Sequence, residues 1–534
     1  MRRRSTYIHD PSLDVPPNRL QVKGAQFLVG ALKAAREERL TFGFDELPPE
    51  LLEVLQLSHE LHIRWASESP FNTTAPFLSR LSPGLHVHYT PLKQRQNGLL
   101  CPFLQKAFSQ EMHCHSPETS FIRPPLISER FASTSSWQYY SPLGSLSNLV
   151  AYIQRHVCVP SDISCLHTAS LLNIVDALDF DYDSISHALL VTAFWSKPPA
   201  VFYDPIGEFT TYDAWNIDIK AESGDKVEVG ILSSSPPTDA HDLQLSGFLT
   251  VVGEDDHPKA TLFSFPSRHH SLTASQASAQ RYDVSFLPPT GLHPTLQISF
   301  PSASSLIAPT TRPAGSVCAL HAYLTLPSFI FADKYAFLGN DPLFQESHHL
   351  GQLRSISGET DLEAPDYVVR KWGSTMLLEL GVPDSGLNQT TPTLPHTWDV
   401  TIPLHLRYLP PADGGQSVAQ VPWPVVFWAC TAEEGTKFPV NPFDRTQLGY
   451  DGLFGPRTMF YHLEPAPIVG TKRPLVEKIT IPVLDTKSPW ASAVELVTAV
   501  AILSGFCWVL MRLAPALSYQ IGLRRDKGHQ KKTQ

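Results

Sequence analysis

The sequence has few charged residues, few cysteines and only one long apolar run, and each shortage excludes a class of protein. Charged residues make up 17% of the 534 residues, against about 25% in a typical soluble domain, while apolar residues supply 42%. This balance excludes a disordered chain and a coiled coil. The formal net charge of −10 gives no general attraction to a phosphate backbone. A nucleic-acid partner is therefore not expected.

Cysteine is too scarce for a small disulfide-framed scaffold. The chain has 7 cysteines and no C-x-x-C pair, which also argues against a zinc module. Cys507 lies in the apolar run near the C-terminus, which leaves an even set: Cys101, Cys114, Cys158, Cys165, Cys318 and Cys430. An even set can pair in many ways, so the sequence leaves the disulfide connectivity open.

Familiar catalytic motifs are absent as well, since the sequence contains no G-x-S-x-G elbow, H-E-x-x-H pair or Walker A loop. The strongest hint of chemistry is DFDYD, with Asp179, Asp181 and Asp183. Alternating carboxylates of this DxD kind can hold a cation and a sugar-phosphate donor, yet such patterns often form only a solvated turn or strand edge. We expect no catalytic residue, cofactor or metal site. A glycosyltransferase using Asp181 and Asp183 is the minor alternative.

The single long apolar run extends from Trp490 to Met511, and Glu495 is its only charged residue. As a helix it would measure about 33 Å, enough to cross a hydrocarbon core of about 30 Å. The run therefore predicts one transmembrane helix over 490–511, which a stalk over 467–489 precedes and a basic tail over 512–534 follows.

The tail indicates an orientation, because the positive-inside rule places its basic residues in the cytosol. Its last residues, KKTQ with Lys531 and Lys532, resemble the dilysine retrieval signal of endoplasmic reticulum membrane proteins. Sequons begin at Asn72 and Asn388, and both would be glycosylation sites if the body faced the lumen. We expect a lumenal body, although no cleavable signal peptide is visible. A tail-anchored protein with a cytosolic body is the competing arrangement.

Alternating apolar residues predict that the body is mainly β. The clearest run is 398–408, where Pro403 cannot donate a ladder hydrogen bond and so indicates a sheet edge or a bulge. A second run, 421–429, could pair with the first as a long-looped hairpin. Helical patterns are found over 46–59 and 145–156. Further strands are predicted over 225–232, 248–253, 260–265, 295–300, 318–326 and 374–381.

The expected architecture is a β-sandwich-like domain with a further β-rich α+β region before it and one transmembrane helix after it. Stretches rich in Pro or Ser suggest the boundaries between the parts. Before the stalk, the helix and the tail, the expected parts are an N-terminal α+β region over 1–115, a β-rich middle region over 116–265 and the sandwich domain over 266–466.

Several segments of the C-terminal half resemble the PIG-X family, and together they cover about residues 288–511. In order along the chain they are GLHP (291–294), LPSFIFADKY (326–335), LEAPDY (362–367), IPLHLRYLPP (402–411) and VFWAC (426–430). In the N-terminal half, SERFASTSSWQYYS (128–141) is similar to the long fungal form of that family.

The resemblance implies a lumenal, glycosylated, single-span subunit of glycosylphosphatidylinositol (GPI) mannosyltransferase I in the endoplasmic reticulum. Such a subunit is non-catalytic and stabilises a multispanning, PIG-M-type catalytic partner, which adds the first mannose to the GPI-anchor precursor. Asp333, Lys334 and Arg407 lie in the resembling segments and are candidate partner contacts. A general lumenal folding factor, which would act like a chaperone, is the alternative.

Overall fold

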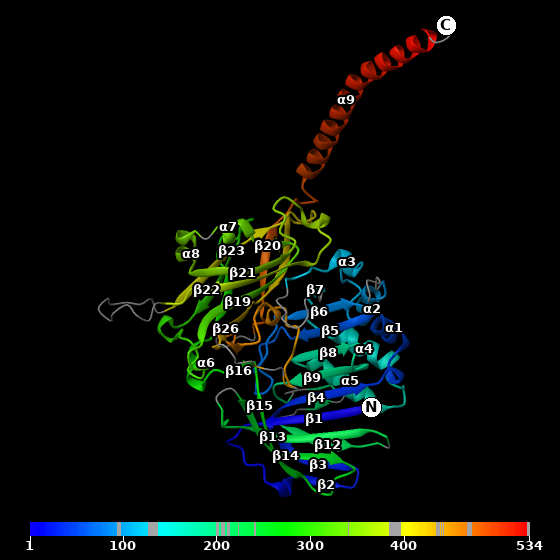
Figure 1. Cartoon of the computed structure of the whole chain (residues 1–534). Coiled ribbons are helices and arrows are strands. Elements are labelled where there is room, and N and C mark those ends of the chain that lie inside the picture. The colour runs from blue at the N-terminus through cyan, green and yellow to red at the C-terminus, as the bar shows by residue number, and fades with distance from the viewer. Residues whose placement is uncertain are drawn as a thin grey trace, which may run out of the picture. The chain divides into compact units, whose positions relative to one another are not determined.

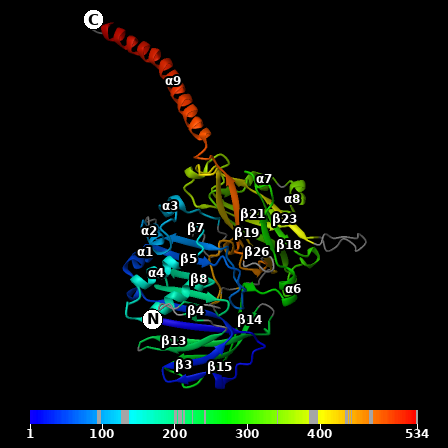
Figure 2. The same ribbon diagram turned by 180° about the vertical axis from the view of Figure 1, so that it is seen from behind.

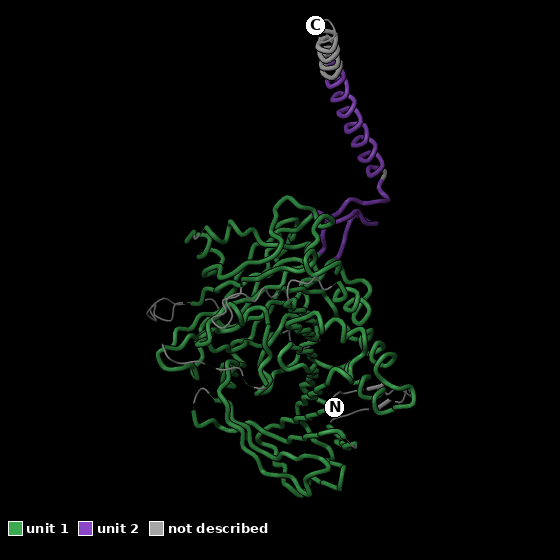
Figure 3. Tube along the Cα trace, turned by 45° about the vertical axis from the view of Figure 1, so that its right-hand side comes forward, with its two compact units in different colours: residues 1–407, 419–479 green, residues 408–418, 480–534 purple. Residues whose placement is uncertain are grey.

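The computed structural model of the chain describes residues 1–92, 98–125, 137–198, 202–203, 209–210, 214–222, 224–239, 242–339, 341–383, 397–433, 438, 441, 443–466 and 473–530. The chain forms two compact units (Figure 3). Unit 1 contains residues 1–407 and 419–479, and unit 2 contains residues 408–418 and 480–534. Strands dominate unit 1, and the long apolar helix belongs to unit 2. The predicted mainly β class is confirmed.

The N-terminal half of unit 1 is built on a ten-stranded sheet (Figure 1). Its order is β15-β14-β13-β1-β4-β9-β8-β5-β6-β7, and only β1 and β13 run parallel. Strands from both sides of residue 115 therefore share one sheet. Their bounds are β1 (Arg2–His9), β4 (Ala34–Phe42), β5 (Ser58–Ala66), β6 (Gly84–Pro91), β7 (Trp137–Ser141), β8 (Ala177–Asp183), β9 (Ala188–Trp195), β13 (Lys226–Ser235), β14 (Asp242–Val252) and β15 (Lys259–Pro266).

Helices contribute to the same core as the ten-stranded sheet. They are α1 (Pro49–Gln56), α2 (Leu100–Ala107), α4 (Ser147–His156) and α5 (Ile163–Leu171), with a short α3 (Pro117–Ser120). Helices α1 and α4 confirm the two helices that periodicity predicted over 46–59 and 145–156. A small sheet of β12 (Trp215–Lys220), β3 (Gln26–Leu32) and β2 (Gln21–Lys23) adds Trp215 and Phe27 to this core. Two short strands, β10 (Phe202–Tyr203) and β11 (Phe209–Thr210), pair with each other.

The C-terminal half of unit 1 is sandwich-like (Figure 1 and Figure 2). A six-stranded sheet has the order β16 (His269–His270), β27 (Thr458–His462), β26 (Val425–Thr431), β19 (Val317–Pro327), β22 (Gly373–Leu380) and β21 (Leu350–Gly358). A three-stranded sheet contains β17 (Asp283–Phe286), β18 (Thr295–Phe300) and β23 (Trp398–Pro403). Both faces of β19 are buried, with Tyr323 and Leu324 each 2% exposed. Three short helices complete this half: α6 (Ala274–Ala279), α7 (Lys334–Leu338) and α8 (Pro342–His348).

The predicted strand over 398–408 is interrupted at Pro403, where a missing N–H ends the ladder. β23 ends there at the edge of its sheet, and β24 (His405–Leu406) pairs instead with β20 (Ile330–Phe331). The predicted hairpin with 421–429 is wrong, because β26 lies between β19 and β27 in the six-stranded sheet. The other six predicted strands are confirmed as β13, β14, β15, β18, β19 and β22.

All six body cysteines are paired, as Cys101–Cys114, Cys158–Cys165 and Cys318–Cys430. The first two bridges fasten helices of the N-terminal half, and the third joins β19 to β26. Each bridge lowers the entropy of the unfolded chain and thereby stabilises the fold.

Unit 2 contains α9 (Pro489–Gln530), whose segment Trp490–Pro515 has a mean hydropathy of 2.1 and is not buried by the rest of the chain. By length and composition this segment can cross a membrane, as the sequence predicted. Two strands, β25 (Gln416–Pro422) and β28 (Val476–Pro482), each contain residues of both units.

Candidate functional site

The acidic segment DFDYD forms most of β8, a strand inside the ten-stranded sheet rather than a solvated turn. Alternate residues of a strand share one face, so Asp179, Asp181 and Asp183 lie on the same side of the sheet. Asp179 is 4% exposed, and the side chain of Asp181 is 24% exposed. Two of the three carboxylates are therefore largely removed from water and need partners.

Positively charged side chains supply those partners. Arg64 on the neighbouring β5 is 1% exposed, and its guanidinium lies 2.6 Å from Asp181 and 3.2 Å from Asp179. Arg445 binds Asp179 at 2.6 Å, and His62 Nδ1 lies 2.7 Å from Asp181. Burial alone would raise the pKa of Asp181, but Arg64 and the hydrogen bond with His62 hold it well below its usual range. The two arginines occupy the positions that a cation would need.

Asp183 stands apart from this cluster. Its carboxylate accepts hydrogen bonds from the backbone N–H groups of Ile185 and Ser186, both at 2.8 Å, and so closes the turn between β8 and β9. An Asx interaction of this kind is a common way to stabilise a turn. Within the part of the chain that the structure describes, no three His, Cys, Asp or Glu side chains converge as metal ligands do.

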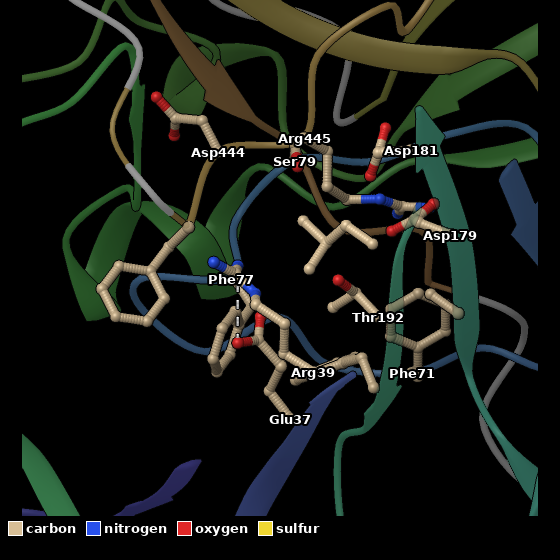
Figure 4. Close-up of a pocket in the computed structure, with 14 residues that line it drawn as sticks. Glu37, Arg39, Phe71, Phe77, Ser79, Asp179, Asp181, Thr192, Asp444 and Arg445 are labelled. Carbon is tan, nitrogen blue, oxygen red and sulfur yellow. Dashed lines mark hydrogen bonds and ion pairs between the residues drawn. The ribbon is translucent and has the colours of Figure 1, made fainter. Parts of the chain in front are cut away.

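A small cavity lies beside the cluster (Figure 4). Its volume is about 70 Å³, whereas sites for small organic ligands usually have about 300–1,000 Å³. Glu37 and Arg39 from β4 line it, together with Asp444 and Arg445. Burial raises the pKa of Asp444 to about 6 and also raises the pKa of Glu37. The cavity has room for a few water molecules but not for a sugar-phosphate donor.

The same cluster joins the two halves of unit 1. Asp179 and Arg445 are 266 residues apart, and Arg64 Nε also donates to the backbone oxygen of Thr446 at 2.6 Å. Nearby, the Tyr450 hydroxyl donates to the backbone oxygen of Arg80 at 2.8 Å. Sequence spacing gives no indication of such distant pairs. The acidic segment therefore acts as a structural joint.

A second joint centres on Gln138 of β7. Its Nε2 donates to the Tyr323 hydroxyl of β19 at 3.2 Å, and its backbone oxygen accepts from Trp372 Nε1 at 2.8 Å. The side chains of Ala66 and Leu81 belong to one buried cluster with Tyr323 and residues of the C-terminal half. The long N-terminal part of the chain is thus packed into the same unit as the segments that resemble PIG-X.

Arg407, a candidate partner contact, is 2% exposed. Its guanidinium donates to the backbone oxygens of Ser328 at 3.0 Å and Ala364 at 2.7 Å, and also to those of Glu359 and Asp361. It lies 4.1 Å from the centroid of the Phe331 ring. In this chain Arg407 fastens the LEAPDY segment to β20, and contact with a partner stays a prediction.

The other candidate contacts lie at the start of α7. Asp333 caps this helix by accepting the N–H of Tyr335 at 2.9 Å, and Lys334 Nζ lies 5.0 Å from the centroid of the Tyr335 ring. Tyr335 near the start of α7 is 66% exposed and Leu338 at its end is 57% exposed, so both ends of this short helix are accessible. Sequence reasoning selected the two charged residues but not the apolar ones beside them.

Among the remaining predicted sites, Asn72 is exposed on a loop after β5. Asn388, Lys531 and Lys532 lie outside the described residues. Their roles stay predictions.

Comparison with known proteins shows to which family the segments that resemble PIG-X and the N-terminal half belong. A family model described as PIG-X / PBN1 matches residues 289–514. Protein pbn1 of Emericella nidulans is 49% identical, over 96% of this chain and 95% of its own. Protein pbn1 of Aspergillus oryzae is 45% identical over 100% of both chains, and that of Neurospora crassa is 42% identical over 97% and 96%. These similarities include the N-terminal half that is joined to the matched segments, so the chain belongs to the PIG-X / PBN1 family.

Proposed function

We propose that this chain is a non-catalytic accessory subunit of GPI mannosyltransferase I and acts in the synthesis of the GPI anchor. Membership of the PIG-X / PBN1 family supports a role in this pathway. The observation that carries the non-catalytic part is the acidic cluster. Its Asp179 and Asp181 are neutralised by Arg64, Arg445 and His62, so they are not free to hold a metal and a donor.

A lumenal body fits this proposal. Three disulfides close loops in the body, and disulfides persist in the secretory compartments but are rare in the cytosol. Exposed Asn72 would be accessible to glycosylation there. The basic tail would then lie in the cytosol, where Lys531 and Lys532 would be read for retrieval to the endoplasmic reticulum. A tail-anchored arrangement would leave the three disulfides in a reducing compartment.

The subunit acts by binding. One apolar helix and a body whose described residues form no metal-ligand cluster can support sugar transfer by stabilising the enzyme that performs it, a multispanning PIG-M-type mannosyltransferase. A ligand that binds only the folded state stabilises it by about 1.4 kcal/mol for each tenfold excess over the dissociation constant. Loss of the subunit would expose the enzyme to degradation. Asp333 and Lys334, beside exposed Tyr335, are the proposed contacts.

Affinity purification of the tagged full-length chain in a mild detergent tests this proposal. We expect one multispanning mannosyltransferase to be recovered in a fixed ratio to the chain. Lys334→Glu should lower that ratio, while Lys23→Glu on exposed β2 is the matched control. Recovery of many unrelated lumenal proteins without the enzyme would favour the general folding factor. An undiminished ratio for Lys334→Glu would remove α7 from the contact.

A further inference from the structure

A second, larger cavity lies on the opposite face of the ten-stranded sheet, and its volume is about 730 Å³. Successive residues of a strand point to opposite faces of the sheet, and the residues that line the two cavities follow this alternation. β9 turns Leu190, Thr192 and Phe194 toward the small charged cavity, whereas Val191 and Ala193 line the larger one. Both cavities have charged and apolar side chains in their lining, and apolar side chains predominate in the larger one.

The walls of the larger cavity are mainly apolar on both sides. The sheet contributes Leu40, Phe42, Ile63, Phe180 and Val191, and the helices contribute Leu51, Phe103, Leu149 and Ile153. Charged groups at one end neutralise one another, because Glu38 accepts hydrogen bonds from both Arg3 and Arg36. The Arg36 guanidinium also lies 5.0 Å from the ring centroids of Trp195 and Trp215. The Met1 amino group likewise pairs with Glu46 and Asp225. The lining also contains Asp162, Asp218, Lys220 and Glu222, but apolar side chains form most of it and favour a mainly apolar ligand.

The Tyr152 hydroxyl, a polar group in the lining, has no hydrogen-bond partner among the described residues. Tyr152 on α4 is 7% exposed and lines the cavity. Its hydroxyl is buried and forms no hydrogen bond with any described residue. Buried hydroxyls usually find a partner, because leaving one unpaired costs free energy. Almost none of the surface of this hydroxyl oxygen is accessible, so a ligand in the cavity would contact the ring of Tyr152 and not its hydroxyl.

The loop that Cys158 and Cys165 close adjoins the cavity and exposes some apolar side chains. Val157 at the end of α4 lines the cavity and is 45% exposed. Val159 and Ile163 follow it in the loop that Cys158 and Cys165 close, and they are 61% and 66% exposed. Exposed apolar side chains grouped on a short, cross-linked loop commonly mark a contact with an apolar partner.

We propose that this cavity holds one long hydrocarbon chain of a membrane lipid. A peptide is a poorer occupant, because its backbone N–H and C=O groups would need partners that an apolar wall does not offer. Membrane lipid is an apolar ligand that is available to this chain, because its segment Trp490–Pro515 can cross a membrane. The proposal does not depend on which enzyme the chain binds.

Photo-crosslinking of the full-length chain in phosphatidylcholine vesicles tests the proposal and identifies the kind of chain. One arm uses phosphatidylcholine with a diazirine on its acyl chain, and the other uses a diazirine-bearing polyprenyl phosphate. Mass spectrometry then maps the labelled peptides. We expect label on the cavity-wall helices α4 and α5 in at least one arm, in addition to α9. The arm that labels the wall shows whether the lipid is acyl or isoprenoid.

Variants that fill the cavity separate specific binding from general contact with lipid. Thr168→Trp from the helix wall and Val191→Trp from the sheet wall should each lower wall labelling at least fivefold and leave α9 labelling unchanged. Ile185→Trp adds the same ring at an 82% exposed position and is the matched control. Two fillers from opposite walls keep the test valid if one variant fails to fold.

Tyr152→Phe is a second control. It should leave both wall labelling and the temperature of thermal unfolding unchanged, because it removes an inaccessible hydroxyl that has no partner among the described residues. Labelling confined to α9 in both arms would overturn the proposal. Wall labelling equal in Thr168→Trp, Val191→Trp and Ile185→Trp would overturn it as well.

Discussion

Replacing Asp181 by Asn separates a structural acidic cluster from a catalytic one. The substitution keeps the size of the side chain but removes the charge that faces Arg64 and His62. Because Arg64 is 1% exposed, its charge would lose a partner that water cannot replace. A donor-binding site would instead lose activity while the protein stayed folded. The two accounts therefore predict different changes in protein level.

The magnitude follows from the remaining contacts. Removing one member of a fully buried ion pair costs about 3–5 kcal/mol. Arg64 keeps Asp179 at 3.2 Å, and the Asp181 side chain is 24% exposed, so we expect a smaller loss of about 2–3 kcal/mol. Such a loss lowers the ratio of folded to unfolded protein roughly 30- to 150-fold. Asp183→Asn, which alters only a turn, should cost a few tenths of a kcal/mol, at roughly the level of a surface change.

Thermal unfolding of the purified chain and its steady-state level in cells measure these changes. We expect Asp181→Asn to lower both, and Asp183→Asn to lower neither. Any loss of GPI-anchor synthesis should follow the protein level. If both variants abolished synthesis at normal level and normal stability, the structural interpretation would be refuted and the glycosyltransferase alternative restored.

Further predictions concern the body of the protein. Arg407→Ala should lower the free energy of unfolding by about 2–4 kcal/mol and reduce the protein level, because several buried carbonyls lose their donor; a normal level with lost enzyme binding would make Arg407 a docking residue instead. Burial lowers the pKa of His86 and His321 to about 4 and that of His462 to about 3. The unfolded chain therefore takes up protons first as the pH falls through 6.5, and the free energy of unfolding should decrease by about 2 kcal/mol per histidine between pH 7 and 5. Thermal unfolding at the two pH values measures this decrease. Equal stability at both values would show that these imidazoles are accessible to protons in the folded chain. Asn72→Gln should increase gel mobility to the extent that removal of one glycan does, whereas unchanged mobility together with digestion of the body by protease added to intact microsomes would place the body outside the lumen.

Local patterns predicted strands only after residue 224, together with two helices and the apolar helix, because alternation and periodicity record which face of an element is buried. The strands before β13, which include seven of the ten-stranded sheet, were not predicted. Local patterns also failed where the partner of a strand is set by distant sequence. Residues 398–408 and 421–429 both alternate in sequence, yet the first run is divided between β23 and β24, the second between β25 and β26, and β23 and β26 belong to different sheets. Alternation says that a strand has a buried face but not which strand lies beside it.

The same limit applies to the candidate site. The DxD spacing placed three aspartates on one face, but their function depends on Arg64 and Arg445, which no spacing links to them. Arg407 was expected to be available to a partner because it alternates with apolar residues. The structure buries it, since the strand breaks at Pro403 and β24 pairs with another segment. The larger cavity needed four helices and the ten-stranded sheet together, so no single segment could indicate it.

The central claim is that the chain supports sugar transfer by stabilising the enzyme rather than by catalysing the reaction. The most direct test is to deplete the chain while degradation of the PIG-M-type mannosyltransferase is blocked, and then to measure the mannosylated GPI precursor. We expect depletion alone to lower the enzyme level and to accumulate precursor that lacks mannose, and we expect restoring the enzyme level to restore mannosylation. Absence of mannosylated precursor at a fully restored level of correctly folded enzyme would contradict the claim, because the chain would then contribute to the reaction itself.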